Sequence, residues 1–413
     1  MPTPIRVLHF ADIHIGTENY GHLDSATGIN SRVLDFLRRF DEVITYGLKH
    51  DVDLAIFAGD AFKTRDPNPT LQREFARRVK RLVDAGVPLV MLVGNHDLPV
   101  MEKKASSVDI YRTLGVPNVI VGWQEDLHIV ETRRGKVQVG MAPYPMRNRL
   151  MVQAEHRDKS IEELDKSLQE IVGDNLRALA DQIDARWPAI LTGHFTVSGA
   201  VYGSERSVMI GGDVPALKSV LTDGAWDYVA LGHIHKHQDL NAGRYPAVVY
   251  PGSLERIDFG EEREAKGFCW VELVKGQTTW QFVEVAARPF ITIPVDARSA
   301  DDPTEAVLAA IAQQSVAGAI VRITVRLRAD QALHDQDVRA ALREADFVAG
   351  INRQVDQAAR DRLGGVSPEG LTHDQLLAQY LSAKQIPADR AAILLQRAAD
   401  LMQPIGGVYE SEN

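Results

Sequence analysis

The chain has 413 residues, of which 45% are hydrophobic and 25% charged, an ordinary composition for a globular protein of two or three domains. Its one cysteine, Cys269, excludes an intrachain disulfide. The first residues lack the layout of a signal peptide, and no apolar run approaches the roughly 20 residues of a membrane-spanning helix. We therefore expect a cytoplasmic protein without a membrane segment.

The formal net charge is −10, which argues mildly against a nucleic-acid partner. The charge is unevenly spread, however. Residues 1–150 hold 20 Lys and Arg against 18 Asp and Glu, whereas the remaining residues hold 26 against 38. The acidic total therefore does not exclude DNA as a partner of the first part of the chain.

Five short apolar runs, each typical of a strand buried on both faces, end in polar clusters. They are Ile5–Phe10 before Ala11-Asp12-Ile13-His14, Asp53–Ala58 before Gly59-Asp60, Pro88–Val93 before Gly94-Asn95-His96-Asp97, Ala189–Thr192 before Gly193-His194, and Asp227–Leu231 before Gly232-His233-Ile234-His235. Helical spacing at about residues 30–50, 70–85 and 160–186 completes the pattern of an α/β layered fold. In such sheets ligands gather at the carboxyl ends of strands, where all five clusters fall.

In the later part of the chain the pattern of predicted helices and strands changes twice. The strands Ala247–Tyr250, Gly267–Leu273 and Thr279–Val285 are expected to complete a second sheet. A small α+β module follows, with strands Phe290–Val295, Ala319–Leu327 and Phe347–Val355 and helices near Pro303–Gln314 and Asp335–Ala345. The stretch Arg360–Pro368 is typical of a linker, and amphipathic helices are predicted near His373–Lys384 and Ala388–Met402. We predict domains over residues 1–285, 286–360 and 361–413.

Seven residues at the strand ends are of types that bind metals, three as oxygen donors and four as imidazoles. They are Asp12, His14, Asp60, Asn95, His194, His233 and His235. This set exceeds what one ion takes from a protein, and it suffices for two ions if one carboxylate bridges them. Two divalent ions ~3.5–4 Å apart can promote hydrolysis of a phosphate ester. Each residue alone has an ordinary alternative as a cap, turn or exposed loop residue, but five consecutive strand ends with ligand types do not.

The ordered set Asp-x-His, Gly-Asp, Gly-Asn-His-Asp, Gly-His and Gly-His-x-His resembles the calcineurin-like metallophosphoesterases over about residues 5–255. Narrower motifs resemble the SbcD-type nuclease subunits of bacterial SbcCD complexes. These motifs are Asn30-Ser31-Arg32 with Asp35-Phe36, Ala58–Phe62 with Arg65–Thr70, Thr192–Gly199, Pro251–Ser253, and Glu255–Glu261. The resemblance implies a four-layer α-β-β-α sandwich with a small α+β DNA-capping domain and C-terminal helices.

The resemblance also implies roles for single residues. One metal would be held by Asp12, His14, Asp60 and His235, and the other by Asp60, Asn95, His194 and His233, so that Asp60 bridges two Mn²⁺ ions. Other divalent ions remain open. His96 would be the general acid near the leaving 3′ oxygen.

Relatives often carry His or Asp where this chain has Lys63, which is either a phosphate contact or a solvated surface residue. The Lys63 ammonium cannot accept a hydrogen bond from His96, so what orients His96 stays open, with Asp97 as a neighbour in sequence.

The function implied is that of an Mn-dependent DNA nuclease, a double-strand exonuclease and single-strand endonuclease. It would act with the ATPase SbcC, bound by the C-terminal helices, in double-strand-break and hairpin processing, and would form a homodimer through its first helices. Candidate DNA-binding residues, each of which could equally be solvated, are Arg73, Arg77, Arg78, Lys80, Arg81, Lys103, Lys104, Arg133, Arg134, Arg147 and Arg149. The alternatives are a phosphodiesterase of the same superfamily with a non-DNA substrate, and a non-catalytic DNA-end-binding scaffold.

Overall fold

A computed structural model of the protein describes residues 3–98, 104–146, 160–203, 213, 215–356 and 372–402. The chain divides into two compact units. The first comprises Met1–Ile293, Gln314–Arg322 and Arg339–Gly350, and the second comprises Pro294–Gln313, Ile323–Val338 and Ile351–Asn413. None of the helices in the described ranges has both the length and the apolar character needed to cross a bilayer.

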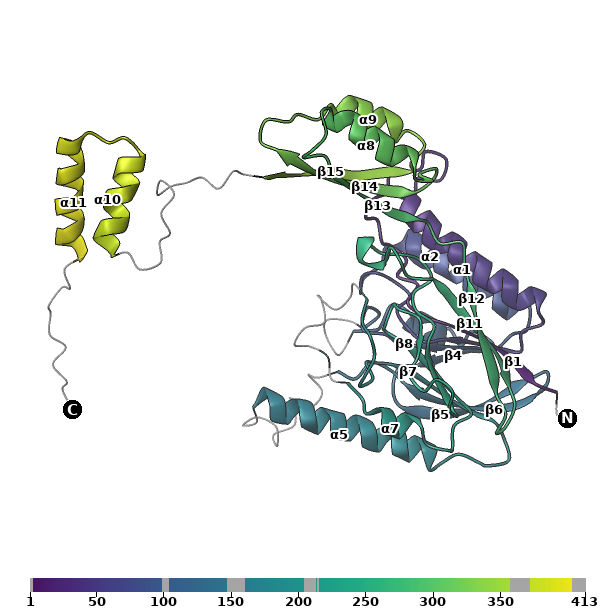
Figure 1. The fold of residues 1–413 in the computed structure, drawn as a ribbon. Helices are drawn as coiled ribbons and strands as arrows, with labels where there is room; N and C mark the ends of the chain where they lie inside the picture. Colours follow the sequence, from purple (N-terminus) through teal and green to yellow (C-terminus); the bar gives the residue numbers. More distant parts are fainter. Residues whose placement is uncertain are drawn as a thin grey trace, which may run out of the picture. The chain divides into compact units, whose positions relative to one another are not determined.

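Two six-stranded sheets form the centre of the first unit (Figure 1). In the first sheet β1 (Ile5–Phe10), β2 (Leu54–Phe57), β3 (Leu89–Leu92) and β4 (Val119–Gly122) run parallel. On the other side of β1, β11 (Gly267–Leu273) pairs antiparallel with β1, and β12 (Thr279–Glu284) pairs antiparallel with β11. The second sheet has the order β5 (Asp126–Thr132), β6 (Gly135–Ala142), β7 (Ala189–His194), β8 (Tyr228–Gly232), β10 (Ala247–Tyr250) and β9 (Gln238–Asp239).

The prediction that the strands after residue 237 complete the second sheet is correct for β10 and wrong for β11 and β12. These two strands join the first sheet, where His9 of β1 lies opposite Cys269 of β11. The parallel strands leave one edge of β1 unpaired, and β11 satisfies the backbone groups along that edge. Strands β4, β5 and β6 were not predicted. The apolar run of β4 is only four residues long and is not directly followed by ligand-type residues, and β5, at the end of its sheet, is mostly half-buried or exposed.

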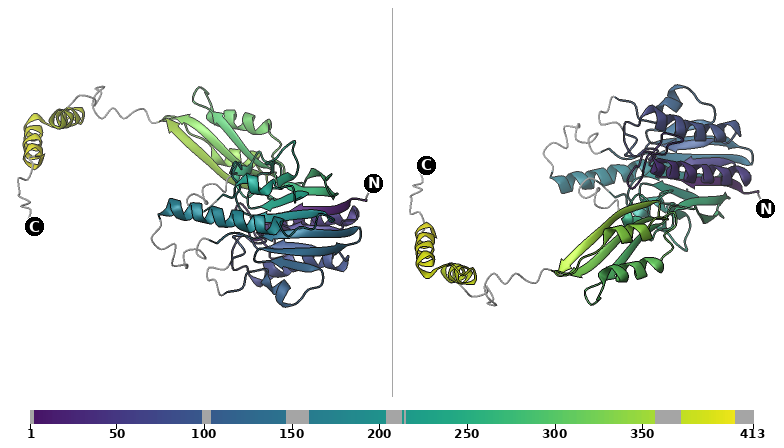
Figure 2. Two further views of the ribbon diagram at one scale, coloured as in Figure 1. Left: turned by 90° about the horizontal axis from the view of Figure 1, so that it is seen from below. Right: turned by 90° about the horizontal axis from the view of Figure 1, so that it is seen from above.

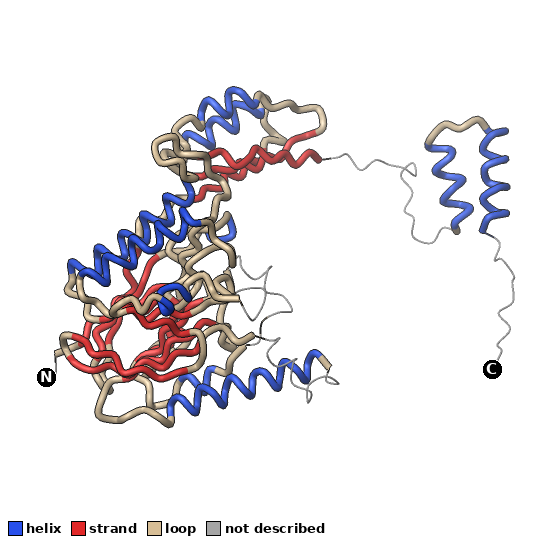
Figure 3. The backbone as a smooth tube through the Cα atoms, turned by 180° about the vertical axis from the view of Figure 1, so that it is seen from behind, coloured by secondary structure: helices blue, strands red, loops and turns tan. Residues whose placement is uncertain are grey.

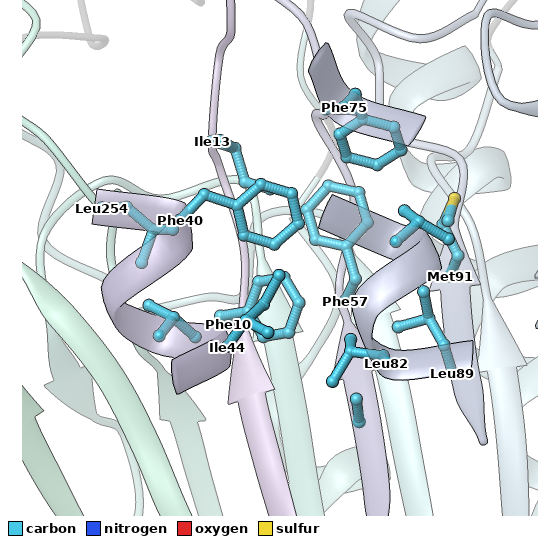
Figure 4. Packing of buried hydrophobic residues seen from close by; sticks show 14 of the residues in the cluster. Phe10, Ile13, Phe40, Ile44, Phe57, Phe75, Leu82, Leu89, Met91 and Leu254 are labelled. Carbon is cyan, nitrogen blue, oxygen red and sulfur yellow. The ribbon is translucent and has the colours of Figure 1, made fainter. Parts of the chain in front are cut away.

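Helices cover the outer faces of both sheets, so the four-layer α-β-β-α arrangement is confirmed (Figure 3). Side chains alternate along each strand. Val7 and Ile56 lie in the cluster between the two sheets, whereas Phe10 and Phe57 pack against α1 (Ser31–Lys49) and α2 (Pro69–Asp84), as Figure 4 shows. Helix α5 (Ile161–Ala180) packs against the outer face of the second sheet. The short helices α3 (Asp109–Thr113) and α7 (Lys218–Leu221) also lie in this unit.

Local capping explains where the helices begin. The side chain of Asn30 accepts a hydrogen bond from the backbone N–H of Arg32 at the start of α1. At α2, the side chain of Asn68 caps the helix and Pro69 takes the first helical position, where its missing N–H costs nothing. Ser160 and Glu163 form a capping box at α5. These caps place the helices close to the predicted ranges.

The predicted α+β module is a three-stranded sheet with two helices on one face (Figure 2). Its elements are β13 (Phe290–Asp296), α8 (Pro303–Ala312), β14 (Ile320–Arg328), α9 (Asp335–Ala341) and β15 (Phe347–Asp356). The tail helices are α10 (His373–Ala383) and α11 (Ala388–Met402). The predicted linker lies outside the described residues, and the three-domain division stays a prediction.

Asp35 is a buried carboxylate that joins α1 to the segment before β13. Its two oxygens accept hydrogen bonds from Arg288 Nε and Nη2 at 2.5 and 2.6 Å, and Arg32 Nη1 lies 2.7 Å away. Asp35 is 4% exposed. Removing one partner of a buried ion pair leaves a charge uncompensated, so we expect Asp35→Ala to lower the free energy of unfolding by about 3–5 kcal/mol.

Urea denaturation followed by circular dichroism measures this loss. The matched control is Arg38→Ala, because the Arg38 side chain contacts the same carboxylate from a 59% exposed position. An exposed partner contributes about 0–1 kcal/mol. Equal losses in the two variants would contradict the assignment of Asp35 as the buried centre of this network.

Candidate metal centre

The seven predicted ligands come together where the strands of both sheets end. Asp12 and His14 follow β1, Asp60 follows β2, and Asn95 follows β3. His194 ends β7 in the second sheet, and His233 and His235 follow β8. All are buried except Asn95, which is half-buried. Side chains more than 200 positions apart in sequence therefore lie together in one buried polar site.

Backbone strain is concentrated in the same place. Asp12, His14, Asp60 and His233 have φ angles of 51°, 49°, 61° and 98°, in the left-handed region that non-glycine residues rarely adopt. Each such residue costs on the order of 1–3 kcal/mol, and strain of this kind clusters at functional sites. Gly94 permits the close approach, because a Cβ there would lie 2.1 Å from Asp60 Oδ1.

One group of donors gathers around His14. Its Nε2 lies 2.9 Å from His235 Nε2, 3.9 Å from Asp12 Oδ1 and 3.6 Å from Asp60 Oδ2. Asp12 itself is held in place, since its carboxylate accepts the backbone N–H of His233. These four side chains are the ones expected to hold the first metal.

A second group gathers around Asn95. Its Oδ1 lies 3.1 Å from His194 Nε2 and 3.0 Å from His233 Nδ1. The Oδ2 atom of Asp60 lies 3.4 Å from His194 Nε2, so this one oxygen faces both His14 and His194. Asp60 therefore stands between the two groups, in the place expected of a bridging carboxylate.

The donor set fits divalent cations. Two imidazole nitrogens 2.9 Å apart, as in His14 and His235, share at most one proton, and buried lone pairs without a donor are costly. A cation between such atoms satisfies them together, and mixed oxygen and imidazole donors suit Mn²⁺, Fe²⁺ or Zn²⁺. The residues present therefore form a candidate site for two divalent ions.

Burial and neighbouring charges shift the pKa values of the buried site residues. Burial raises the pKa of Asp12 to about 6. Burial lowers the pKa of His194, but the adjacent Asp60 carboxylate more than offsets this and raises it to about 9. A protonated His194 would place positive charge beside Asp60, and a divalent cation held there would supply that charge instead, with the imidazole neutral.

The other ring nitrogen of three histidines is also engaged. His194 Nδ1–H donates to the Ala58 carbonyl at 2.6 Å. His235 Nδ1 lies 2.9 Å from Glu261 Oε1, and His233 Nε2 lies 3.2 Å from Asp213 Oδ2. Sequence reasoning assigned no role to either carboxylate. Glu261 falls in a motif quoted for the family resemblance, whereas nothing in the sequence pointed to Asp213.

His96 is oriented by a backbone carbonyl, which side-chain patterns in the sequence do not reveal. Its Nδ1–H donates to the backbone carbonyl of Lys63 at 2.9 Å, and its backbone N–H donates to Asp60 Oδ1. The alternative, Asp97, instead accepts the backbone N–H groups of Asp60, Ala61 and Gly94. The half-buried His96 ring has an edge contact with His14, with centroids 4.8 Å apart. Burial lowers the pKa of His96, and the Lys63 ammonium adds to this.

The predicted DNA-binding cations are mostly engaged within the protein. Arg78 is 13% exposed and pairs with Asp41 and Glu74, and the more exposed Arg73 and Arg77 also pair with Glu74. Lys80 and Arg81 pair with Asp84 and Asp41. Arg133 and Arg134 pair with Asp53, which lies just before the start of β2, whereas the metal centre lies beyond the other end of that strand. Lys104 is exposed, and Lys103, Arg147 and Arg149 lie outside the described residues. A role for any of them in DNA binding stays a prediction.

Residues 5–237 match the calcineurin-like phosphoesterase family. Because the match spans more than half of the chain and its strand ends carry the metal-ligand cluster, the chain belongs to this family. It is therefore an enzyme that hydrolyses phosphoester bonds.

Relatives narrow the assignment. The chain is 30% identical to the SbcD component of the SbcCD nuclease of Bacillus subtilis (strain 168), over 68% of this chain and 69% of that protein. It is 29% identical to the SbcD component of the Escherichia coli (strain K12) nuclease over 63% of each chain, and 27% identical to the double-strand-break repair protein Mre11 of Haloferax volcanii over 85% of this chain and 68% of that protein. Its group within the family is that of the SbcD-type nucleases.

Proposed function

We propose that the protein is an Mn²⁺-dependent deoxyribonuclease that cleaves double-stranded ends and single strands in double-strand-break and hairpin processing. The observation that carries the proposal is Asp60, whose Oδ2 lies within 3.6 Å of His14 Nε2 and 3.4 Å of His194 Nε2, between the two donor groups. Similarity to the SbcD and Mre11 proteins supports DNA as the substrate.

We assign the ligands as the family resemblance implies. Asp12, His14, Asp60 and His235 would hold one ion, and Asp60, Asn95, His194 and His233 the other. Bound there, two divalent ions would supply Lewis acidity and positive charge for attack on a phosphodiester. All of these ligands except the half-buried Asn95 are buried, which limits competition from bulk water for the donor atoms.

His96 is assigned as the general acid. Its Nδ1–H is held by the Lys63 carbonyl, so Nε2 is the atom that can pass a proton to a leaving oxygen. The lowered pKa of His96 favours the neutral ring in the free protein. The negative charge of a phosphodiester bound beside the ring would oppose this lowering of the pKa. The Lys63 side chain is a candidate phosphate contact, because its positive charge lies close enough to the site to lower the pKa of both His14 and His96.

Cleavage of labelled blunt duplex, hairpin and single-stranded DNA with Mn²⁺, Mg²⁺ or Zn²⁺ tests the proposal. We expect cleavage of all three substrates with Mn²⁺. An enzyme that hydrolyses an aryl phosphodiester but no DNA would instead be a phosphodiesterase with another substrate. A protein that binds DNA ends and hydrolyses neither would be a scaffold. Either result would overturn the nuclease proposal.

The tail helices α10 and α11 are assigned to the SbcC-type ATPase partner. They expose Tyr380, Ile393 and Leu394 by 41%, 59% and 39%, and exposed apolar side chains at helical spacing suit a partner groove. We also infer a homodimer formed through the first helices, as the resemblance implies, which light scattering would detect as twice the chain mass.

Changing the exposed Ile393 to aspartate is expected to abolish association with the SbcC-type partner, because a charge would then have to be buried at the interface. Deletion of residues 366–413 should have the same effect. Co-purification measures association, and Mn²⁺-dependent cleavage of single-stranded DNA is the control, which should be unchanged. Retained association in both variants would place the partner interface elsewhere.

A further inference from the structure

Glu261 is a buried carboxylate whose two oxygens are both engaged. It ends the short 3₁₀ helix η2 (Phe259–Glu261) and is fully buried. Its Oε1 lies 2.9 Å from His235 Nδ1. Its Oε2 accepts the backbone N–H of Ile257 at 2.9 Å and pairs with Lys266 Nζ at 2.9 Å. The carboxylate therefore has little freedom to turn away from His235.

This contact determines which nitrogen of His235 carries the proton. A carboxylate accepts hydrogen bonds, so Nδ1 of His235 must be the protonated atom. Nε2 then carries the lone pair, and Nε2 is the atom that lies 2.9 Å from His14 Nε2 within the first donor group. Glu261 thus presents His235 in the one tautomer that can donate to a metal at that place.

Lys266 anchors the arrangement from behind. Its ammonium is buried and bonds to Glu261, to Glu264 Oε2 at 2.9 Å and to the backbone carbonyl of His235 at 3.2 Å. The same lysine therefore holds both the backbone of His235 and the carboxylate that orients its ring. Two carboxylates on one lysine also leave a net negative charge beside the donor group, which favours a cation there.

We propose that Glu261 is a positioning residue for the first metal, the one assigned to Asp12, His14, Asp60 and His235. The proposal rests on the two-metal function proposed above. The expected effect is selective, because Glu261 acts through His235, which belongs to the first donor group only. Binding of the second ion, assigned to Asp60, Asn95, His194 and His233, should be largely unaffected.

The test is calorimetric titration of Mn²⁺ into the full chain freed of metal. We expect two ions in the wild-type protein. In Glu261→Met, which removes the acceptor at similar size, affinity for one ion should fall about 10–100-fold while the other is retained. Glu261→Gln should recover part of the loss, because the amide oxygen can still accept from Nδ1. The matched control is Glu264→Met, which takes one carboxylate from the same lysine and leaves the bond between Glu261 and His235 in place.

Two ions bound with wild-type affinity by Glu261→Met would overturn the positioning role. So would an equal loss in Glu264→Met, which would mean that the charge around Lys266 matters and the contact with His235 does not. If Glu261→Met does not fold, combining it with Lys266→Met removes both buried charges, and that variant is titrated in the same way. Fewer than two ions in the wild-type protein would instead contradict the proposed function itself.

Discussion

Replacing Asp60 with asparagine is expected to abolish binding of the Mn²⁺ pair and to lower cleavage by at least about 10³-fold. The substitution keeps the shape of the side chain but removes the charge that both donor groups face. An asparagine Nδ2 turned toward His14 and His194 would donate to the nitrogens that must ligate. Loss of metal assistance worth several kcal/mol corresponds to this factor, at about 1.4 kcal/mol per tenfold.

Calorimetry with Mn²⁺ and a single-strand cleavage assay measure the two effects of Asp60→Asn together. The matched comparison is Asn95→Ala, because Asn95 belongs to the second donor group only. That variant should retain one ion. Two ions bound by Asp60→Asn would show that the carboxylate is not shared.

His96→Ser is expected to bind both ions normally and yet to cleave DNA about 10²–10⁴-fold more slowly. The ring is held by the Lys63 carbonyl and lies beside His14, but it is not among the assigned ligands. Loss of a positioned proton donor has an effect of this size. Metal titration and single-turnover cleavage of the same preparation separate binding from chemistry, and cleavage at the wild-type rate would remove His96 from the mechanism.

Lys63→Met separates the side chain of Lys63 from its backbone. The variant keeps the carbonyl that orients His96 and removes only the ammonium. A loss of about tenfold in cleavage would support a charge-assisted phosphate contact, worth roughly 1.5 kcal/mol. An unchanged rate, measured under the same single-turnover conditions, would identify Lys63 as a solvated residue.

Much of the fold follows from local patterns in the sequence. Strands such as Leu54–Phe57 are predicted because both of their faces are buried, which makes the apolar run continuous. Helix α11 over Ala388–Met402 is predicted because its apolar spacing is helical. The sheet that β11 joins could not be predicted, since strand pairing depends on which edge is open in the folded protein and not on the strand's own residues.

The candidate site could likewise be predicted only in part. The ligand types were predictable because each follows an apolar run, as His194 does in β7. The groups that orient them were not, because Glu261 and Asp213 reach His235 and His233 only through tertiary packing. The orientation of His96 depends on a backbone carbonyl, which side-chain identity at Lys63 does not reveal. The left-handed backbone at Asp60 likewise does not follow from the residue type, because aspartate adopts this region more often than most residues but usually has a negative φ.

A crystal of the full chain soaked in Mn²⁺ and measured at the manganese absorption edge tests the central claim most directly. Two anomalous peaks ~3.5–4 Å apart, one on either side of the Asp60 carboxylate, are the predicted result. A single peak, or peaks away from Asp60, would contradict the account.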